Sequence, residues 1–260
     1  MADEIKAPAK PEPAAPDRSP TVRFTEMKSK VETSGRGWDQ MSEFDKAYHR
    51  QSTHMVNKWS NYLPVYERHL GRFQGQRITM LEIGISQGGS LDVWERYFGP
   101  AARIVGVDID KRCTKFARDH IHVEIGSQED PDFLLYLVRK YGPFDFILDD
   151  GGHTMTQQIT TFRTLYPHVT SPGVFMTEDT HTSYEAKFGG GLNNPDSFMN
   201  YAKQFADWLH GWHVPEVAKL APSGFLQSTA SVHFYDSIVV LEKAPQRRPY
   251  MIRRGERTIS

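Results

Sequence analysis

Two pairs of acidic residues each follow an apolar run in the sequence. Asp149-Asp150 comes directly after FDFIL, and Glu178-Asp179 comes directly after GVFMT. Such runs are typical of buried strands, and open α/β sheets bind ligands at the carboxyl ends of their strands. We therefore expect both pairs to face one crevice, where the carboxylates repel one another unless some are protonated or a cation neutralises them. Oxygen ligands favour Mg²⁺ first, and then Mn²⁺ or Ca²⁺.

A histidine lies beside the first acidic pair. His153 follows Asp150 by three residues, and the two glycines between them allow a sharp turn that aims the imidazole back at the crevice. The alternative is that the first acidic pair caps the next helix, that the second pair is solvated, and that His153 is an ordinary histidine near a turn. Two acidic pairs at matched strand ends favour the metal site.

The stretch LEIGISQGGS, Leu81–Ser90, is a candidate cofactor loop. It lacks the G-x-G-x-x-G fingerprint of dinucleotide-binding loops, because Ser86 stands at the second glycine. Glu82, just before the loop, suits a cofactor with an ammonium group better than one with a pyrophosphate. S-adenosylmethionine has an ammonium group and no phosphate, and Asp108, at the end of the next strand, is placed to bind ribose hydroxyls. The alternative is any βαβ unit with a glycine turn.

Other polar residues at strand ends complete the expected cofactor site. Ser127-Gln128 follows the third strand, where a methyltransferase-like sheet would read the adenine amino group. The residues expected to bind the cofactor are Glu82, Gly84, Ser86, Gly88, Ser90, Asp108, Ser127, Gln128 and Asp149.

The elements that position these residues alternate between strand and helix. Strands are expected at 78–81, 104–107, 121–125, 144–148 and 173–176, helices at 91–98, 111–120, 131–141, 156–168 and 197–210, and a hairpin at 231–235 and 238–241. This order predicts an α/β fold, a class I methyltransferase Rossmann-like sheet that is mostly parallel with a C-terminal antiparallel hairpin. We expect a disordered tail at 1–20, a helical cap at 21–75 divided by Pro64, the methyltransferase domain at 76–245 and a tail at 246–260.

Composition narrows the class of protein. The chain has 260 residues, 38% of them hydrophobic, and a formal net charge of −1, which favours neither nucleic acid nor an anionic membrane surface as a partner. No apolar run approaches the ~20 residues that a membrane helix needs. A single cysteine, Cys113, fits a reducing compartment such as the cytoplasm.

The motifs together resemble a known family. DFILDDGGH, GVFMTEDTHTSY, LEIGISQGGSLDVWERYFG and GVDID are similar to the metal-dependent sugar O-methyltransferases of antibiotic biosynthesis, the macrolide-sugar and rhamnosyl enzymes near the cephalosporin hydroxylase-like group. The resemblance covers roughly residues 57–243. It implies that Asp150, Glu178 and Asp179 hold Mg²⁺ and that His153 is the general base.

The sequence also departs from that family. Gly152 stands where the family often has Ser, and this difference weakens nothing essential. Ser127 stands where the family often has an acid, and this second difference weakens the expected adenine contact. The macrolide enzymes carry a large N-terminal domain, and the segment before residue 75 is short for one. The acceptor and the assembly therefore do not follow from the resemblance.

These observations predict an S-adenosylmethionine-dependent, Mg²⁺-assisted O-methyltransferase acting on a vicinal diol of a sugar attached to a natural product. We expect a small-molecule glycoside as acceptor, a homo-oligomer, and loop 180–195 as a lid. The alternatives are an NAD-dependent oxidoreductase or a cephalosporin hydroxylase-like enzyme on the same sheet, and a non-catalytic binding module. The missing dinucleotide fingerprint argues against the oxidoreductase, and the intact acidic residues with His153 argue against the binding module.

Overall fold

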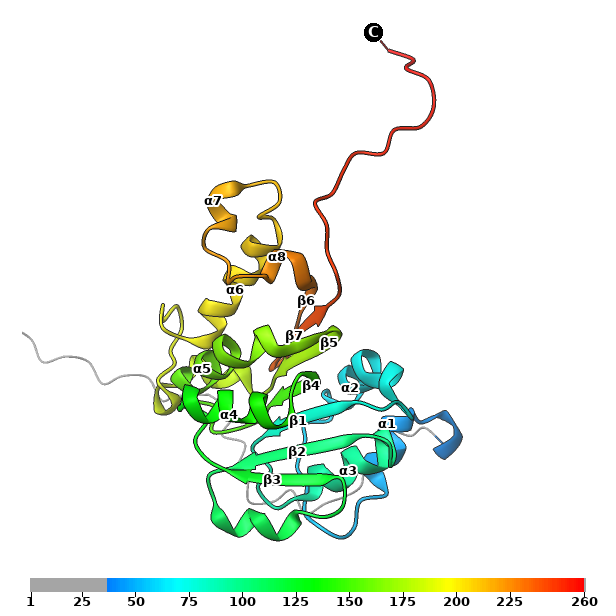
Figure 1. Ribbon diagram of the computed structural model, residues 1–260, viewed down its shortest axis with the longest axis vertical. Helices are drawn as coiled ribbons and strands as arrows, with labels where there is room; N and C mark the ends of the chain where they lie inside the picture. The colour runs from blue at the N-terminus through cyan, green and yellow to red at the C-terminus, as the bar shows by residue number, and fades with distance from the viewer. Residues whose placement is uncertain (1–36, 260) are drawn as a thin grey trace, which may run out of the picture. The chain divides into compact units, whose positions relative to one another are not determined.

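The computed structural model describes residues 37–259 (Figure 1). The tail predicted at 1–20 lies outside this range. Within residues 37–259, seven strands form one sheet in the order β3-β2-β1-β4-β5-β7-β6. The strands are β1 (Thr79–Ile83), β2 (Arg103–Asp108), β3 (Ile121–Ile125), β4 (Phe144–Asp149), β5 (Val169–Thr177), β6 (Thr229–Tyr235) and β7 (Ile238–Lys243).

The strand directions agree with the predicted fold. Strands β1 to β5 pair in parallel, β7 pairs antiparallel with β5, and β6 pairs antiparallel with β7. The closing hairpin turns at Asp236-Ser237, where Ser237 has a φ of 67°. The mostly parallel sheet with a C-terminal antiparallel hairpin is confirmed.

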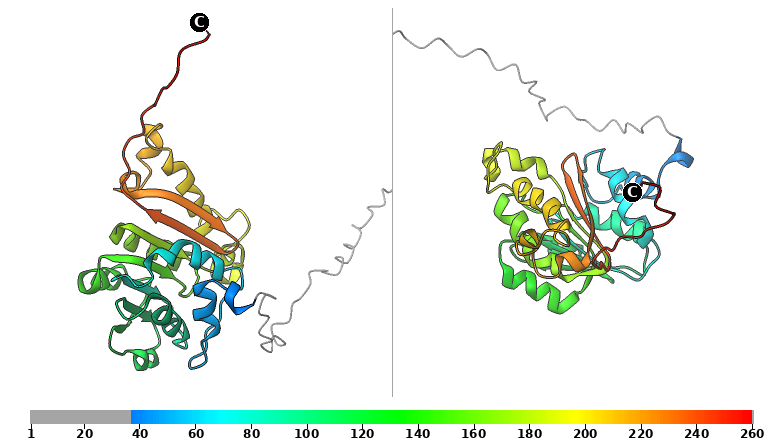
Figure 2. Two further views of the ribbon diagram at one scale, coloured as in Figure 1. Left: turned by 90° about the vertical axis from the view of Figure 1, so that its right-hand side faces the viewer. Right: turned by 90° about the horizontal axis from the view of Figure 1, so that it is seen from above.

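Helices cover both faces of the sheet (Figures 1 and 2). On one face α1 (Glu43–His49), α2 (Leu63–Leu70) and α3 (Gly89–Phe98) share a core cluster with the sheet. On the other face α4 (Pro131–Tyr141), α5 (Met155–Leu165) and α6 (Phe198–Leu209) form a second cluster. Two short helices, α7 (Pro215–Ala218) and α8 (Phe225–Ser228), were not predicted.

Local sequence accounts for the bounds of α4. The Asp130 side chain accepts hydrogen bonds from the backbone N–H groups of Asp132 and Phe133, and Pro131 occupies the first turn. Leu134 and Leu137 then bury one face of the helix. The helix coincides with the predicted range 131–141.

Two predicted helices differ from the structure. Pro64 does not divide a helix, because the chain from Arg50 to Tyr62 contains no α-helix and Pro64 lies in the first turn of α2, where its missing N–H costs no intrahelical bond. The helix predicted at 111–120 is a 3₁₀ helix, Lys111–Phe116. The boundaries of the cap and of the sheet domain stay predictions.

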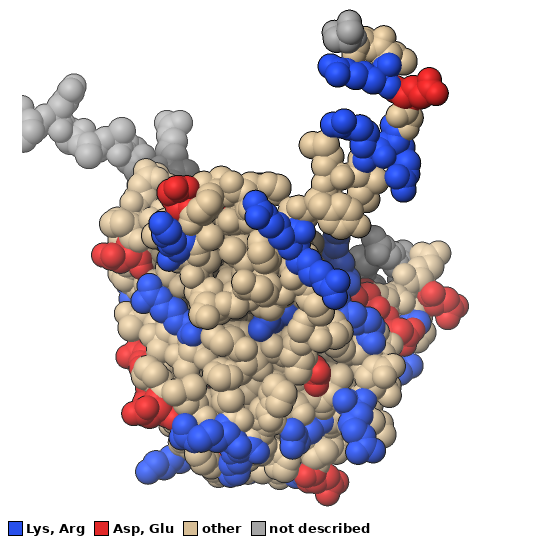
Figure 3. Space-filling model, turned by 45° about the horizontal axis from the view of Figure 1, so that its top comes forward, with Lys and Arg blue, Asp and Glu red and all other residues tan. Residues whose placement is uncertain are grey.

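The surface shows no single-sign charged region in the view of Figure 3, where acidic and basic side chains are both scattered among uncharged ones. Residues 247–259 extend from β7 and are exposed (Figures 1 and 2). None of the helices between residues 37 and 259 is long and apolar enough to cross a membrane.

Candidate active site

The glycine loop joins β1 to α3 and is fixed by its neighbours. Gly84 has a φ of +88°, and a Cβ there would overlap the carbonyl oxygen of Asp150 at the end of β4. Asp108 Oδ2, at the end of β2, accepts hydrogen bonds from the N–H groups of Ile85 (3.2 Å) and Ser86 (2.8 Å). The acid predicted to bind ribose therefore also holds the loop in place.

A cavity of about 410 Å³ lies at the carboxyl ends of β1 to β4. The segment 55–58, between α1 and α2, closes one side of it. The predicted cofactor residues that line the cavity are Gly84, Ser86, Ser90, Asp108, Ser127 and Gln128. Asp150 and His153 line it as well. Its walls thus combine most of the expected cofactor residues with one expected metal ligand and the expected base.

Glu82 does not line the cavity, contrary to its predicted contact with an ammonium group. Its side chain is fully buried behind the wall, where its two oxygens accept hydrogen bonds from Ser90 Oγ (2.8 Å) and Trp94 Nε1 (3.1 Å). Burial raises the pKa of Glu82 to about 7. Glu82 therefore supports Ser90 and α3 in this structure, and its direct contact with a cofactor stays a prediction.

Asp149 and Gly88 also lie behind the cavity wall. Asp149 is 1% exposed, and its Oδ1 accepts a hydrogen bond from Gln128 Nε2 (3.0 Å). The Gln128 Oε1 atom in turn accepts a hydrogen bond from the N–H of Gly152 (2.8 Å). Asp149 and Gln128 thus connect the turn after β3 with the turn after β4, while Gly88 packs against Phe116.

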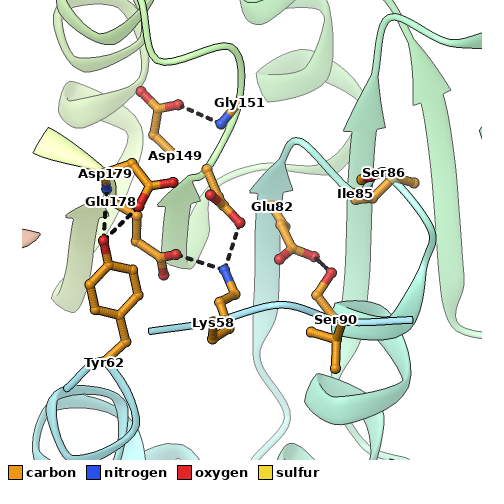
Figure 4. Close-up of polar contacts among 12 residues, drawn as sticks. Lys58, Tyr62, Glu82, Ile85, Ser86, Ser90, Asp149, Gly151, Glu178 and Asp179 are labelled. Atoms are coloured by element: carbon orange, nitrogen blue, oxygen red, sulfur yellow. Dashed lines mark hydrogen bonds and ion pairs between the residues drawn. The ribbon is translucent and has the colours of Figure 1, made fainter. Parts of the chain in front are cut away.

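The remaining acidic residues form a cluster with one lysine (Figure 4). The Nζ atom of Lys58 lies 2.6 Å from Asp150 Oδ2 and 2.7 Å from Glu178 Oε2. Tyr66 donates its hydroxyl to the other oxygen of Glu178. Both oxygens of Glu178 therefore already have partners, and its side chain is fully buried. We call Asp150, Glu178, Asp179 and Lys58 the acidic cluster.

Asp179, the remaining acid of the cluster, contacts Tyr62 and His153. Its Oδ1 accepts a hydrogen bond from Tyr62 (2.6 Å), and its Oδ2 lies 3.4 Å from His153 Nε2. His153 has a φ of 61°, and its carbonyl oxygen accepts a hydrogen bond from Thr182 Oγ1 (2.9 Å). The left-handed backbone thus lies at His153 itself, beyond the two glycines, and it directs the ring toward Asp179.

The donor set fits a divalent cation. Asp150, His153 and Asp179 each offer one ligand atom, and these atoms lie within 4.8 Å of one another. The two carboxylates suit Mg²⁺ or Mn²⁺, whereas an imidazole is a more typical ligand of softer ions such as Zn²⁺. Glu178, the third predicted ligand, is not in this set, and its metal contact stays a prediction.

Burial governs the charges of the cluster. Burial raises the pKa of Glu178 to about 8, against the lowering effect of Lys58. Burial raises the pKa of Asp150 as well, although Lys58 again lowers it. For Lys58, burial alone would lower the pKa, but Asp150 and Glu178 raise it well above its ordinary value. The lysine is thus held as an ammonium ion.

The loop predicted as a lid is folded near its start. It contains the 3₁₀ helices Thr180–Tyr184 and Ala186–Phe188, and three side chains of the first are buried. A Cβ at Gly190 would lie 2.5 Å from the backbone of Ser183, so this glycine permits close packing within the loop. A hinge role for the glycines stays a prediction.

Sequence reasoning missed Lys58 as a site residue. Tyr62 and Tyr66 stand in an aromatic-rich segment, which is a weak signal for a wall of a pocket. Lys58 is 92 residues from Asp150 and 120 from Glu178, and no local pattern distinguishes it from a surface lysine.

Known proteins share this fold and sequence. No family model matches the chain. The chain is 38% identical over 197 residues to the 8-demethyl-8-(2-methoxy-alpha-L-rhamnosyl)-tetracenomycin-C 3'-O-methyltransferase of Streptomyces olivaceus. The matched region covers 71% of this chain and 50% of the relative. It is 32% identical over 193 residues to the mycinamicin VI 2''-O-methyltransferase of Micromonospora griseorubida, which covers 70% of this chain and 48% of the relative.

A solved structure agrees with these relatives. The MycE methyltransferase from the mycinamycin biosynthetic pathway, in complex with Mg, SAH and mycinamycin VI, superposes with a TM-score of 0.70 at 28% identity, over 79% of this chain and 54% of that one. The chain spans about half the length of the curated relatives it matches. The resemblance inferred from the motifs is confirmed: this chain has a class I methyltransferase fold and is related to the sugar O-methyltransferases of macrolide and tetracenomycin biosynthesis.

Proposed function

We propose that this chain catalyses S-adenosylmethionine-dependent, Mg²⁺-assisted O-methylation of a sugar hydroxyl on a glycosylated natural product, as part of antibiotic biosynthesis. One observation carries the proposal. Asp150 and His153 line the cavity expected to hold the cofactor, and both also belong to the set of possible metal ligands with Asp179. The proposed positions of the cofactor, the metal and the base therefore adjoin one another.

The relatives support the acceptor class. The names of the two Streptomyces olivaceus relatives specify 3'- and 2'-O-methylation of rhamnosyl tetracenomycins. The MycE complex holds Mg and SAH together with the macrolide mycinamycin VI. Because the chain covers about half of each relative, the sugar and the aglycone are extended to this chain as a proposal.

The proposal includes a role for each residue of the site. Gly84 and Ser86 form the floor of the cofactor cavity, Asp108 receives the ribose, and Ser127 with Gln128 faces the adenine. Asp150 and Asp179 hold the metal, with Glu178 as the third ligand expected from the family resemblance. When bound, the cofactor supplies an electrophilic methyl group and the metal makes a coordinated hydroxyl more acidic.

His153 is assigned as the base. A sugar hydroxyl is a far weaker acid than an imidazolium ion, so the pKa of the acceptor lies many units above that of a histidine. His153 alone is too weak for full deprotonation across that gap, so it would act on a hydroxyl whose pKa is lowered by a metal ion that Asp150 and Asp179 would hold. Its Nε2 lies 3.4 Å from Asp179 Oδ2, so the proposed base is a direct neighbour of a proposed metal ligand.

A glycoside screen tests the proposal. The protein is incubated with S-adenosylmethionine, Mg²⁺ and a panel of rhamnosylated and other deoxysugar glycosides, and products are analysed by mass spectrometry. We expect a product heavier by one methyl group, lost with a chelator and restored by Mg²⁺. Calorimetry with S-adenosylhomocysteine and with NAD separates the alternatives, since binding of NAD but not of S-adenosylhomocysteine would indicate an oxidoreductase.

We propose further that the protein is a homo-oligomer in the cytoplasm. A buried, unpaired Cys113 is compatible with a reducing compartment. Light scattering on the full chain measures the oligomeric state. A monomer at micromolar concentration would contradict the proposed homo-oligomer.

A further inference from the structure

Lys58 enters the acidic cluster from outside the sheet. It lies between α1 and α2, and its neighbours Met55, Val56 and Asn57 line the cofactor cavity. Its side chain is only 5% exposed. A lysine buried to this degree needs charge partners, because an isolated ammonium ion is costly to remove from water.

The hydrogen-bond partners of the ammonium group are two carboxylates. Asp150 and Glu178 accept its hydrogen bonds at 2.6 and 2.7 Å. The ring of Tyr66 lies 5.8 Å away, and Glu82 adds a further favourable charge interaction. Lys58 therefore occupies a position where a cation is required, beside the ligand atoms of Asp150, His153 and Asp179.

We propose that Lys58 is the resident cation of the acidic cluster: its ammonium group holds Asp150 and Glu178 together in the metal-free protein and opposes the binding of a divalent metal at the same cluster. The inference rests on the metal site of the proposed function. Lys58 acts here as a positioning residue, because it works through the carboxylates and has no assigned contact with the acceptor.

Two physical consequences follow. Two cations that share Asp150 repel each other, so metal affinity is lower than the carboxylates alone would give. The ammonium group also prevents Asp150 and Glu178 from repelling each other when metal is absent, so the metal-free cluster keeps its arrangement. Removing one partner of a buried ion pair leaves an uncompensated charge, and a metal ion can then replace the lost ammonium group.

Mn²⁺ binding measures the first consequence. Free Mn²⁺ is titrated by electron paramagnetic resonance at pH 8 against the wild type, Lys58→Met and the control Lys140→Met. Lys140 is 45% exposed and pairs with Glu124 on β3, so its substitution makes the same charge change away from the cluster. We expect Lys58→Met to bind Mn²⁺ roughly tenfold or more tightly than the wild type, and Lys140→Met to match the wild type.

Thermal unfolding of the same proteins tests whether a metal ion can replace the ammonium group. Saturating Mn²⁺ should raise the Tm of Lys58→Met more than that of the wild type. If Lys58→Met is unfolded without metal, Mn²⁺ should restore its folding. Circular dichroism and binding of S-adenosylhomocysteine report the folded state.

The outcomes separate the inference from the proposed function. A wild type that binds no Mn²⁺ would overturn the metal site and the inference together. A wild type that binds Mn²⁺, with a folded Lys58→Met that binds it equally or more weakly, would overturn the inference alone. A Lys58→Met protein that stays unfolded in millimolar Mn²⁺ would overturn it as well.

Discussion

The substitution Glu82→Gln distinguishes two roles for the buried acid of β1. As a direct ligand of a cofactor ammonium group, Glu82 could not lose its charge without a large loss of affinity. As a support behind the cavity wall, it holds Ser90 and Trp94, and a glutamine can do the same. The amide oxygen accepts from Trp94 Nε1, and the amide nitrogen donates to Ser90 Oγ, whose hydroxyl can rotate.

The pH dependence of stability follows from the raised pKa. Burial raises the pKa of Glu82 to about 7 in the folded protein, against 4.5 ordinarily. Between these values the folded state binds more protons than the unfolded state, so the contribution of Glu82 to stability falls as pH rises. From pH 5 to pH 8 the loss amounts to about 2.5 kcal/mol. Glutamine has no such loss, so Glu82→Gln should gain about 2.5 kcal/mol relative to the wild type over this interval.

Urea unfolding at pH 5, 6, 7 and 8 measures this gain, with Glu129→Gln as the control for the loss of one exposed carboxylate. We expect the relative gain for Glu82→Gln only, and an affinity for S-adenosylhomocysteine within about threefold of the wild type, since ~0.6 kcal/mol is a minor change. A relative stability that does not change with pH would refute the burial argument. A loss of affinity of a hundredfold or so in a folded Glu82→Gln protein would instead restore Glu82 as a direct ligand.

Three further substitutions test other parts of the site. Gly84→Ala should prevent stable folding, because its Cβ would overlap the carbonyl of Asp150. The control Gly224→Ala lies in the left-handed region with open space around it, so it should cost only ~1 kcal/mol in urea unfolding. Equal losses would contradict the packing argument. Asp108→Ala should raise the Kd for S-adenosylhomocysteine by roughly tenfold or more, because the loop loses two charge-assisted hydrogen bonds. Calorimetry should give an unchanged Kd for the exposed control Asp132→Ala. An unchanged Kd for Asp108→Ala would exclude a role of Asp108 in cofactor binding. His153→Ala should lower kcat by ~10²–10⁴ with little change in cofactor affinity; a rate equal to that of the exposed control His210→Ala would remove His153 from catalysis.

The sequence predicts those parts of the fold that local chemistry decides. Helix α4 is defined by three local signals: the cap at Asp130, Pro131 in the first turn and Gly142 after the last turn. The residues between β6 and β7 define the hairpin turn. In each case the signal lies within a few residues of the element, so no knowledge of distant contacts is required.

The side chains that complete the site depend on tertiary packing. Strand β1 is buried along its whole length, so its apolar run does not show whether Glu82 faces the cavity or α3. The ion pair between Lys58 and Glu178 joins residues 120 positions apart, and only the packing of the segment before α2 against the sheet brings them together. The acidic pairs were predictable because strand ends imply a common edge, whereas the lysine between them was not.

The most direct test of a shared site for cofactor and metal is nuclear magnetic resonance of S-adenosylmethionine labelled with ¹³C at its methyl group. The labelled cofactor is bound to the protein, and Mn²⁺ is then added without acceptor. A metal held by Asp150 and Asp179, beside the cavity, should broaden the methyl resonance strongly, and excess Mg²⁺ or the substitution Asp179→Asn should reverse the broadening. A methyl resonance that stays sharp while Mn²⁺ is bound would contradict the account, because cofactor and metal would then occupy separate sites.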